Sequence, residues 1–176
     1  MPITTYDVAL KAQWDALLAA FSSEAVVGKR LDGISYVGRT FDLWTEKAPA
    51  IGVQLMSASV GPSASMQREL TTVYAVVVGC QSTDATASAN MGANTPANIE
   101  DAMNQVQSFV ADGAGNGIIP ILCDAANFTL GGYAYEILSG NVKYDWQVMP
   151  GEEAQIWAYA VIMVTAKQKT WIQGSA

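Results

Sequence analysis

The last long apolar stretch of the chain, residues 156–166, constrains its fold more than any other segment. Small or aliphatic side chains occupy the even positions of this stretch, and larger side chains such as Trp157, Tyr159 and Met163 occupy the odd positions. Successive side chains of a β-strand point to opposite faces of the sheet, so a strand without polar alternation needs cover on both sides. We therefore expect a sheet with two apolar faces, one of which is covered by a partner.

Length and composition fit a single globular domain, residues 1–176. Of the 176 residues, 51% are hydrophobic and 14% are charged. These fractions lie far from the low hydrophobicity and high charge of disordered chains, and a domain of this size buries roughly 70% of its unfolded surface. Within this domain we expect a flexible loop at residues 81–94, which is rich in small polar residues, and a short C-terminal tail at residues 168–176.

The sequence predicts a soluble protein that is not exported. Its beginning carries Asp7 and Asp15 where a signal peptide would be uncharged. The apolar run at residues 156–166 is shorter than the ~20 residues that span a bilayer as a helix, so we expect no membrane contact. Because Cys80 and Cys123 are too few and too far apart for a disulfide framework or a zinc site, we expect free thiols in a reducing compartment.

The charge balance argues against adhesion to nucleic acid. Nine basic residues stand against sixteen acidic ones, which gives a formal net charge of -7 and a sequence pI near 4.4. Binding to phosphates relies on clustered Lys and Arg, and the densest basic segments here are only residues 29–30 and 167–169. The acidic field would instead repel DNA, which suits a protein through which DNA must slide.

No catalytic constellation is visible in the sequence. The chain has no histidine, which removes the usual general base of hydrolases and the commonest transition-metal ligand. Residues 61–65 lack the final glycine of a nucleophile elbow, and the glycine-rich residues 113–117 follow a helix rather than the strand that precedes a phosphate loop. The acidic pairs at 100–101 and 152–153 are sequence neighbours whose side chains point apart. We assign no catalytic, cofactor-binding or metal residue and expect a protein that is not an enzyme.

The order of the predicted elements indicates an α+β fold. Helical spacing of apolar residues predicts helices at 5–22 and, after the Thr95-Pro96 start, at 99–110, and the stripe of the first helix is Leu10, Trp14, Leu17, Leu18 and Phe21. Strands are predicted at 51–56, 70–80, 140–149 and 155–167, with turns at 57–63 and 150–151. Residues 34–37 and 40–44 fit two short strands or an extended loop, and residues 113–135 are expected to be irregular or short-stranded. We expect a mostly antiparallel sheet, with 51–56 and 70–80 as one hairpin and two main helices packed on one face.

Taken together, these elements resemble the tail terminator proteins of long-tailed bacteriophages. The resemblance lies in element order and spans most of the chain. It is carried by the capped helix that begins at Thr4-Thr5-Tyr6-Asp7, the proline-led strand at 48–55, the strand at 71–79, the helix at 99–110, and the closing hairpin of 142–148 with 156–166.

The resemblance implies a structural protein of the virion. A subunit of this family forms a ring, expected to be a homo-hexamer, on the head-proximal end of the tail tube. The ring ends tube polymerisation and presents the head-joining surface. The implied partners are further copies of the chain, the tail tube protein and a head-completion or connector protein, with no cofactor, sequence-specific nucleic acid or membrane. The implied location is the tail or neck of the virion, after assembly in the host cytoplasm.

Two other classes of protein fit the same sequence features. One is another phage neck, head-closure or baseplate-associated structural protein, and the other is a small carboxylate-based enzyme or ligand-binding module. For a tail terminator, the segments 57–68 and 81–94 are candidate contacts with the tube, because loops held by a rigid sheet commonly carry contacts. Solvated connections are the alternative for both segments.

Overall fold

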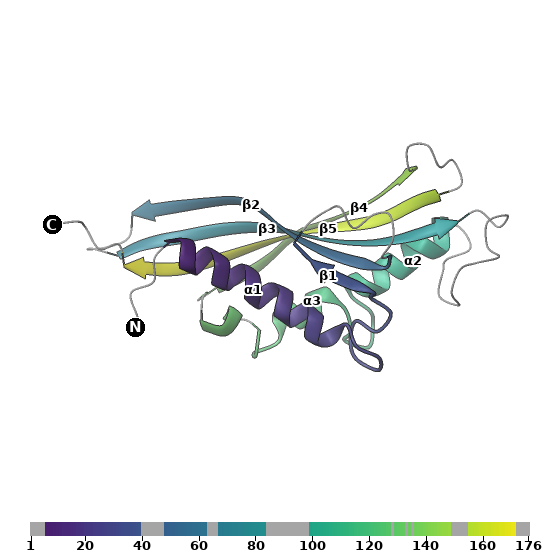
Figure 1. Ribbon diagram of the computed structural model, residues 1–176, viewed down its shortest axis with the longest axis horizontal. Helices are drawn as coiled ribbons and strands as arrows, with labels where there is room; N and C mark the ends of the chain where they lie inside the picture. The colour runs from purple at the N-terminus through teal and green to yellow at the C-terminus, as the bar shows by residue number, and fades with distance from the viewer. Residues whose placement is uncertain are drawn as a thin grey trace.

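A computed structural model describes residues 6–39, 48–62, 67–83, 99–127, 129–132, 134, 136–148 and 155–171. They form a five-stranded sheet, in the order β1-β2-β3-β5-β4, with helices along one face (Figure 1). The elements are α1 (Tyr6–Glu24), β1 (Tyr36–Gly38), β2 (Ala50–Pro62), β3 (Gln67–Thr83), α2 (Ile99–Val110), α3 (Ile118–Cys123), the 3-10 turn η2 (Leu130–Gly132), β4 (Glu136–Val148) and β5 (Gln155–Trp171). All strand pairs are antiparallel except β1 with β2, so the predicted α+β class is confirmed.

Helix α1 packs on the sheet through its predicted stripe and one buried amide. Leu17 and Phe21 are completely buried, as expected from their spacing. Gln13 is also buried, and its Oε1 accepts a hydrogen bond from the Thr72 hydroxyl at 2.7 Å, while its Nε2 donates to Gln168 Oε1 at 3.3 Å. The helix is therefore joined to β3 and β5 by a satisfied polar cluster that the apolar stripe did not reveal.

The hairpin of β2 and β3 is antiparallel as predicted, but both strands are longer than the sequence indicated. The prediction of a turn at 57–63 is wrong for residues 57–62, which continue β2 after a bulge between Leu55 and Ser57. The extra residue of a bulge lets a strand bend without ending, so the pairing of β2 with β3 continues beyond Leu55. Similarly, the predicted loop at 81–94 is wrong for residues 81–83, which continue β3, and its remainder lies outside the described residues.

The closing strands β4 and β5 pair antiparallel, in agreement with the prediction. The predicted tail at 168–176 is wrong for residues 168–171, which extend β5 alongside the beginning of β3. The polar residues that follow Ala166 in the sequence predicted that the strand ends there. Gln168 is nevertheless buried in the sheet, where its side-chain oxygen accepts a hydrogen bond from Gln13. The predicted turn at 150–151 lies outside the described residues.

The segment predicted to be irregular, residues 113–135, contains the short helix α3 and the turn η2. Gly117 precedes α3 with a φ of 106°, and a Cβ there would come within 2.8 Å of the Val110 carbonyl group. Only glycine accepts both conditions. Ile118, Ile121 and Leu122 then face the core, and the proline at position 120 falls in the first helical turn, where it is tolerated.

The first edge of the sheet is built by β1 and α1 together. Of the two short strands predicted, only Tyr36–Gly38 is described, and it pairs parallel to the start of β2. Residues 40–44, the capping residues 4–5 and the Thr95-Pro96 start lie outside the described residues. Beyond β1, the Trp14 indole nitrogen donates to the Val53 carbonyl at 2.9 Å. This bond satisfies a backbone group on the open side of β2.

The two cysteines should differ sharply in reactivity toward a disulfide reagent. Cys80 is buried in β3, and burial raises the pKa of its thiol to about 12, whereas Cys123 is exposed at the end of α3. Near pH 8, the native protein should therefore release one equivalent of reporter per chain and the denatured protein two. In Cys123→Ser the native protein should release almost none; rapid reaction of Cys80 in that variant would show that β3 is not covered as described.

Candidate functional site

The two faces of the sheet differ in what covers them. All of the described helices lie on one face (Figure 1), which we call the helix side. The even-numbered residues of β5 from Ala158 to Ala166 point to the helix side and are completely buried. The odd-numbered residues point to the opposite face, which we call the helix-free face, because successive side chains of a strand alternate. Each face therefore follows directly from the sequence pattern of the last strand.

An apolar band crosses the helix-free face along its two central strands. Its members are Val73, Ala75 and Val77 of β3 and Tyr159, Val161 and Met163 of β5. Register places Ala75 beside Met163 and Val77 beside Val161, so the two rows are contiguous. Ala75 and Val77 are 3% exposed, while the other four members are partly exposed. The band thus offers apolar surface that the described helices do not cover.

Trp157 differs from its neighbours on the same strand. The sequence pattern placed it on the uncovered face together with Tyr159 and Met163, but it is only 2% exposed. Its large ring therefore belongs to the buried part of the molecule. The partly exposed band begins at Tyr159, so the available surface is smaller than the sequence suggested.

Polar and charged side chains border the apolar band. Lys143 and Asp145 of β4 lie beside Val161 and Tyr159 in the register, and Gln54 of β2 lies beside Ala75 on the other side. The Asp145 carboxylate is hydrogen bonded to the Tyr159 hydroxyl, and the pKa of Tyr159 is raised, first by burial and then by the negative charge of Asp145. An apolar centre with a polar border is the usual anatomy of a protein interface.

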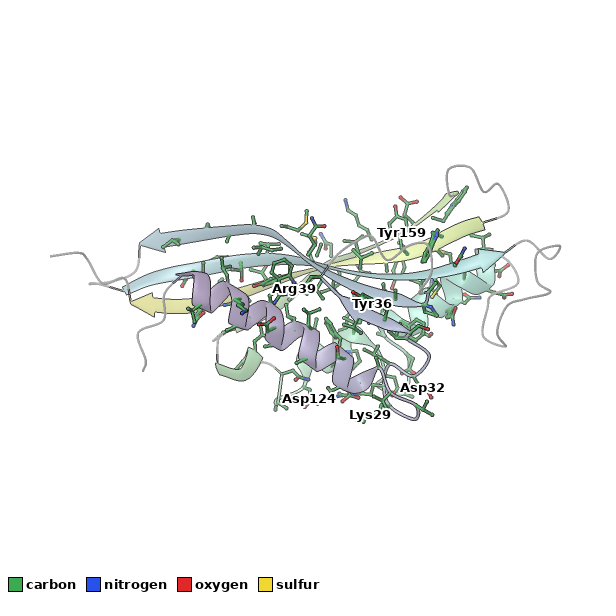
Figure 2. The ribbon with its side chains drawn as sticks, in the orientation of Figure 1. Lys29, Asp32, Tyr36, Arg39, Asp124 and Tyr159 are labelled. Carbon is green, nitrogen blue, oxygen red and sulfur yellow. The ribbon has the colours of Figure 1, made fainter. Side chains whose placement is uncertain are left out.

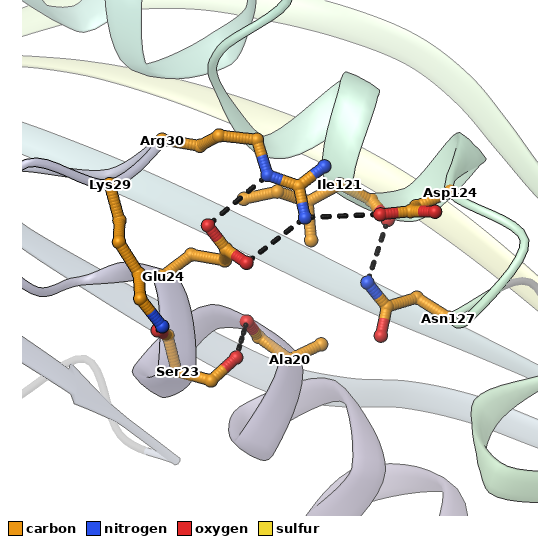
Figure 3. A network of polar contacts seen from close by, with 8 residues as sticks. All are labelled: Ala20, Ser23, Glu24, Lys29, Arg30, Ile121, Asp124 and Asn127. Carbon is orange, nitrogen blue, oxygen red and sulfur yellow. Dashed lines mark hydrogen bonds and ion pairs between the residues drawn. The ribbon is translucent and has the colours of Figure 1, made fainter.

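A second polar cluster, around Arg30, lies on the helix side (Figure 3). Arg30 forms a two-point ion pair with Glu24, at 3.0 and 3.1 Å, and its Nη2 also contacts Asp124 Oδ2 at 3.1 Å. The hydrogen bonds from Arg30 hold the pKa of Glu24 below its ordinary value. This cluster connects the end of α1 to the residue that follows α3. The charges of Arg30, Glu24 and Asp124 therefore have a structural role, which is to hold these two segments together.

The charged loops and the helix-free face lie on different sides of the sheet. Figure 2 shows Lys29, Asp32 and Asp124 below the strands, while Tyr159 stands above them. Next to the Arg30 loop, whose carbonyl accepts from the Gly117 backbone at 3.3 Å, Asp112 accepts hydrogen bonds from the backbone of Ala114 and Asn116, which orders the turn after α2. The charges on the helix side therefore close turns around the core and do not meet the apolar band.

The acidic pairs do not form a site in the part of the chain that the structure describes. Glu100 and Asp101 are exposed in the first turn of α2, where carboxylates interact favourably with the helix dipole. The pair at 152–153 lies outside the described residues. Within the described ranges, no group of three or more His, Cys, Asp or Glu residues is placed to hold a metal ion. Over the same ranges, no helix is both long and apolar enough to cross a membrane.

β2 and β4 carry exposed apolar side chains that sequence reasoning missed. Met56 and Val60 of β2 are 53% and 43% exposed, and Tyr144 and Trp146 of β4 are 41% and 54% exposed. Assignment of residues 57–63 to a turn concealed the first pair. The candidate tube contact at 57–68 is correspondingly wrong as a loop at residues 57–62 and 67–68, which are strand. A sheet edge is present there instead.

No model of a known protein family matches the chain, and no curated protein matches it either.

The Glu24 and Arg30 pair should make stability depend on acidity. Because the folded-state pKa of Glu24 is lowered, its contribution is complete above its unfolded value of 4.5 and is lost as pH falls through the folded value. Glu24→Gln should therefore destabilise the protein by about 1 kcal/mol at neutral pH. Urea unfolding of both proteins between neutral and acid pH measures this difference. A gap that stays constant as the carboxylate is protonated would contradict the role of charge in this contact.

Proposed function

We propose that this chain is a structural protein of a long-tailed bacteriophage virion. In this proposal it assembles as a ring on the head-proximal end of the tail tube, ends tube polymerisation and forms the head-joining surface. The observation that carries the proposal is the apolar band on the helix-free face. A surface of this kind is better suited to contact with another protein than to chemistry on a small molecule.

The anatomy of the band supports an interface of protein with protein. Partly exposed Val161 and Met163 lie at its centre, and Lys143 and Asp145 stand at its border with opposite charges. Such a border adds register and selectivity, while burial of the apolar centre contributes most of the free energy. The same band is present on every copy, as repeated contact with a symmetric tube requires.

Charge and element order add to this proposal. The net charge of -7 would let genomic DNA pass through a ring without adhering to it. The order of helix, hairpin, helix and closing hairpin is the one that resembles the tail terminator family, and this order is retained with longer strands. Partners in this reading are further copies of the chain, the tail tube protein and a head-completion or connector protein.

Loss of the protein should change the length or the attachment of phage tails. A phage with an early stop codon in this reading frame should give lysates with overlong tails, or with tails not joined to heads, because nothing ends the tube and joins it to the head. Electron microscopy of negatively stained lysates measures both features. Expression of the intact chain from a plasmid is the control and should restore infectious particles. Tails of normal length joined to heads in the mutant lysate would rule the proposal out.

A charge placed in the apolar band should prevent the protein from completing tails without unfolding it. Met163 is partly exposed, so the fold should tolerate Met163→Lys at a loss of roughly 1 kcal/mol, whereas an interface would have to bury the new charge. The variant should fail to complement the stop-codon phage. Val27→Lys, at a position 87% exposed in the loop after α1, is the matched control and should complement fully. Full complementation by a folded Met163→Lys protein would remove the band from the interface.

A further inference from the structure

The outer edge of β2 is open over the second half of the strand. β1 pairs only with residues 50–52, and the Trp14 indole occupies the carbonyl of Val53. Among the described residues, none pairs with the outer side of residues 57–62. This segment therefore presents unpaired backbone donors and acceptors in a row, which is the arrangement that accepts an added strand.

β2 has little of the usual protection of an edge strand. Natural edges are blunted by charged side chains, proline, short length or bulges. The 13 residues of β2 include no charged residue, and its single proline stands at the very end. The one bulge lies between Leu55 and Ser57, before the open segment, so residues 57–61 themselves contain no charge, proline or bulge. The composition of this edge is suited to pairing with another strand.

The opposite edge of the sheet is β4, and it has a complementary character. β4 pairs only with β5, so its other side is open in the part of the chain that the structure describes. Tyr144 and Trp146 are 41% and 54% exposed there. Between residues 142 and 148 the charges are Lys143 and Asp145, which cancel each other. Both edges are therefore neutral, although the whole chain carries a net charge of -7.

The direction of the backbone groups on β2 follows from the hydrogen-bond pattern. The Val53 carbonyl accepts from Trp14 and so points away from β3. In an antiparallel ladder, alternate residues direct both backbone groups to the same side. Register beyond the bulge places Ala58 beside Thr72 and Val60 beside Leu70, in phase with Val53 beside Val76. Ala58 and Val60 thus direct their backbone groups outward.

The same alternation, carried across the sheet, fixes the direction on β4. Val76 is paired with Ile162, and Ile162 is paired with Val142. Val76 directs its backbone groups toward β5, so Ile162 directs its own toward β3, and Val142 directs its own away from β5. Because the direction repeats every second residue, Tyr144 and Trp146 also direct their backbone groups outward. Val60, Tyr144 and Trp146 therefore combine outward backbone groups with exposed apolar side chains.

The exposed side chains of both edges also lie on the same face of the sheet. Ala58 and Val60 share the face of Thr72 and Leu70, which are buried on the helix side. Tyr144 and Trp146 are paired with Ala160 and Ala158, and these alanines are likewise buried on the helix side. If the two edges met, their hydrogen-bonding residues would place four apolar side chains directly opposite one another.

We infer that β4 of a second copy of this chain adds to the outer edge of β2, with residues 142–148 antiparallel to residues 56–62. In this register, Tyr144 of the second copy lies opposite Val60, and Trp146 lies opposite Ala58. The inference deepens the proposed ring, on which it rests for the choice of a second copy, by naming how neighbouring copies meet. The sheet then continues from one copy to the next.

Charge and symmetry favour a second copy as the occupant. Two chains with a net charge of -7 repel each other, and a contact between two neutral edges keeps this repulsion smallest. The open segment of β2 lies on the β1 side of the sheet and β4 lies at the other end of the strand order, so each copy uses one edge toward each neighbour. This head-to-tail contact closes into a ring when the rotation per copy permits it.

Cysteine pairs test the contact directly. In a Cys123→Ser background, Val60→Cys and Tyr144→Cys proteins are made separately, mixed at high concentration and oxidised. Opposed residues in such a pair have Cα atoms about 5.5 Å apart, which lies within the span of a disulfide. We expect covalent dimers in the mixture and none in either protein alone. Lys143→Cys, whose side chain points to the helix-free face, is the matched control and should give no cross-link with Val60→Cys.

Other outcomes identify other occupants and overturn the inference. Covalent dimers from Val60→Cys alone would show a two-fold contact of β2 with β2. Absence of the mixed dimer, both in concentrated protein and in purified phage tails that contain both variants, would show that β4 does not bind there. The proposed function fails on a different result, which is normal tails in the absence of the protein, so the two failures are distinguishable.

A proline variant tests whether backbone pairing at this edge drives self-association. Val60→Pro removes an outward N–H and should leave the ladder with β3 intact, because proline is tolerated at an edge when its N–H side faces solvent. We expect self-association, measured by sedimentation equilibrium, to weaken roughly fivefold to tenfold, the effect of one net hydrogen bond. Val60→Thr keeps the N–H and the β-branched shape and should associate like the parent. Equal association of the folded proline variant and the parent would count against strand addition.

Discussion

The pairing of β3 with β5 is the contact on which the rest of the structure depends. The two strands are in register from Gln67 beside Trp171 to Thr83 beside Gln155, over the full length of both. Their central residues are apolar on both faces, which is unusual for an antiparallel sheet and demands two covers. α1, α2 and α3 supply one cover. The demand for a second cover follows from the same pairing and is the physical basis of the proposed contact between the apolar band and another protein.

Much of this fold could be predicted from the sequence, because its central elements have strong periodicity. The β-branched run of β3 and the apolar run of β5 were recognisable as strands, and the spacing of Leu17 and Phe21 predicted the face of α1. The second half of β2 was not recognisable, since Ser57 and Gly61 are typical of turns and only pairing with β3 makes them strand. α3 was concealed for a related reason, because its six residues are too few to show a helical period.

The candidate surfaces also differ in how far the sequence could predict them. The apolar band was predictable because alternation along β5 sorts its side chains between the two faces without any knowledge of neighbours. The buried state of Trp157 and the open edge of β2 were not, because both depend on which segments lie beside them in space. An edge is a property of strand order, and strand order is set by pairings far apart in sequence, such as Gln67 with Trp171.

Joined edges would have a consequence for the orientation of the copies in a ring. A sheet that continues from copy to copy has one face toward the channel and the other face outward, and the helix layers of all copies lie on the same side. α2 carries Glu100 and Asp101 and no basic residue, whereas Lys143 and Asp145 balance each other beside the apolar band. In the proposed ring, α2 would therefore make the helix side the face suited to an acidic channel for DNA. The apolar band would then face outward or along the axis, where another protein of the tail or neck can cover it.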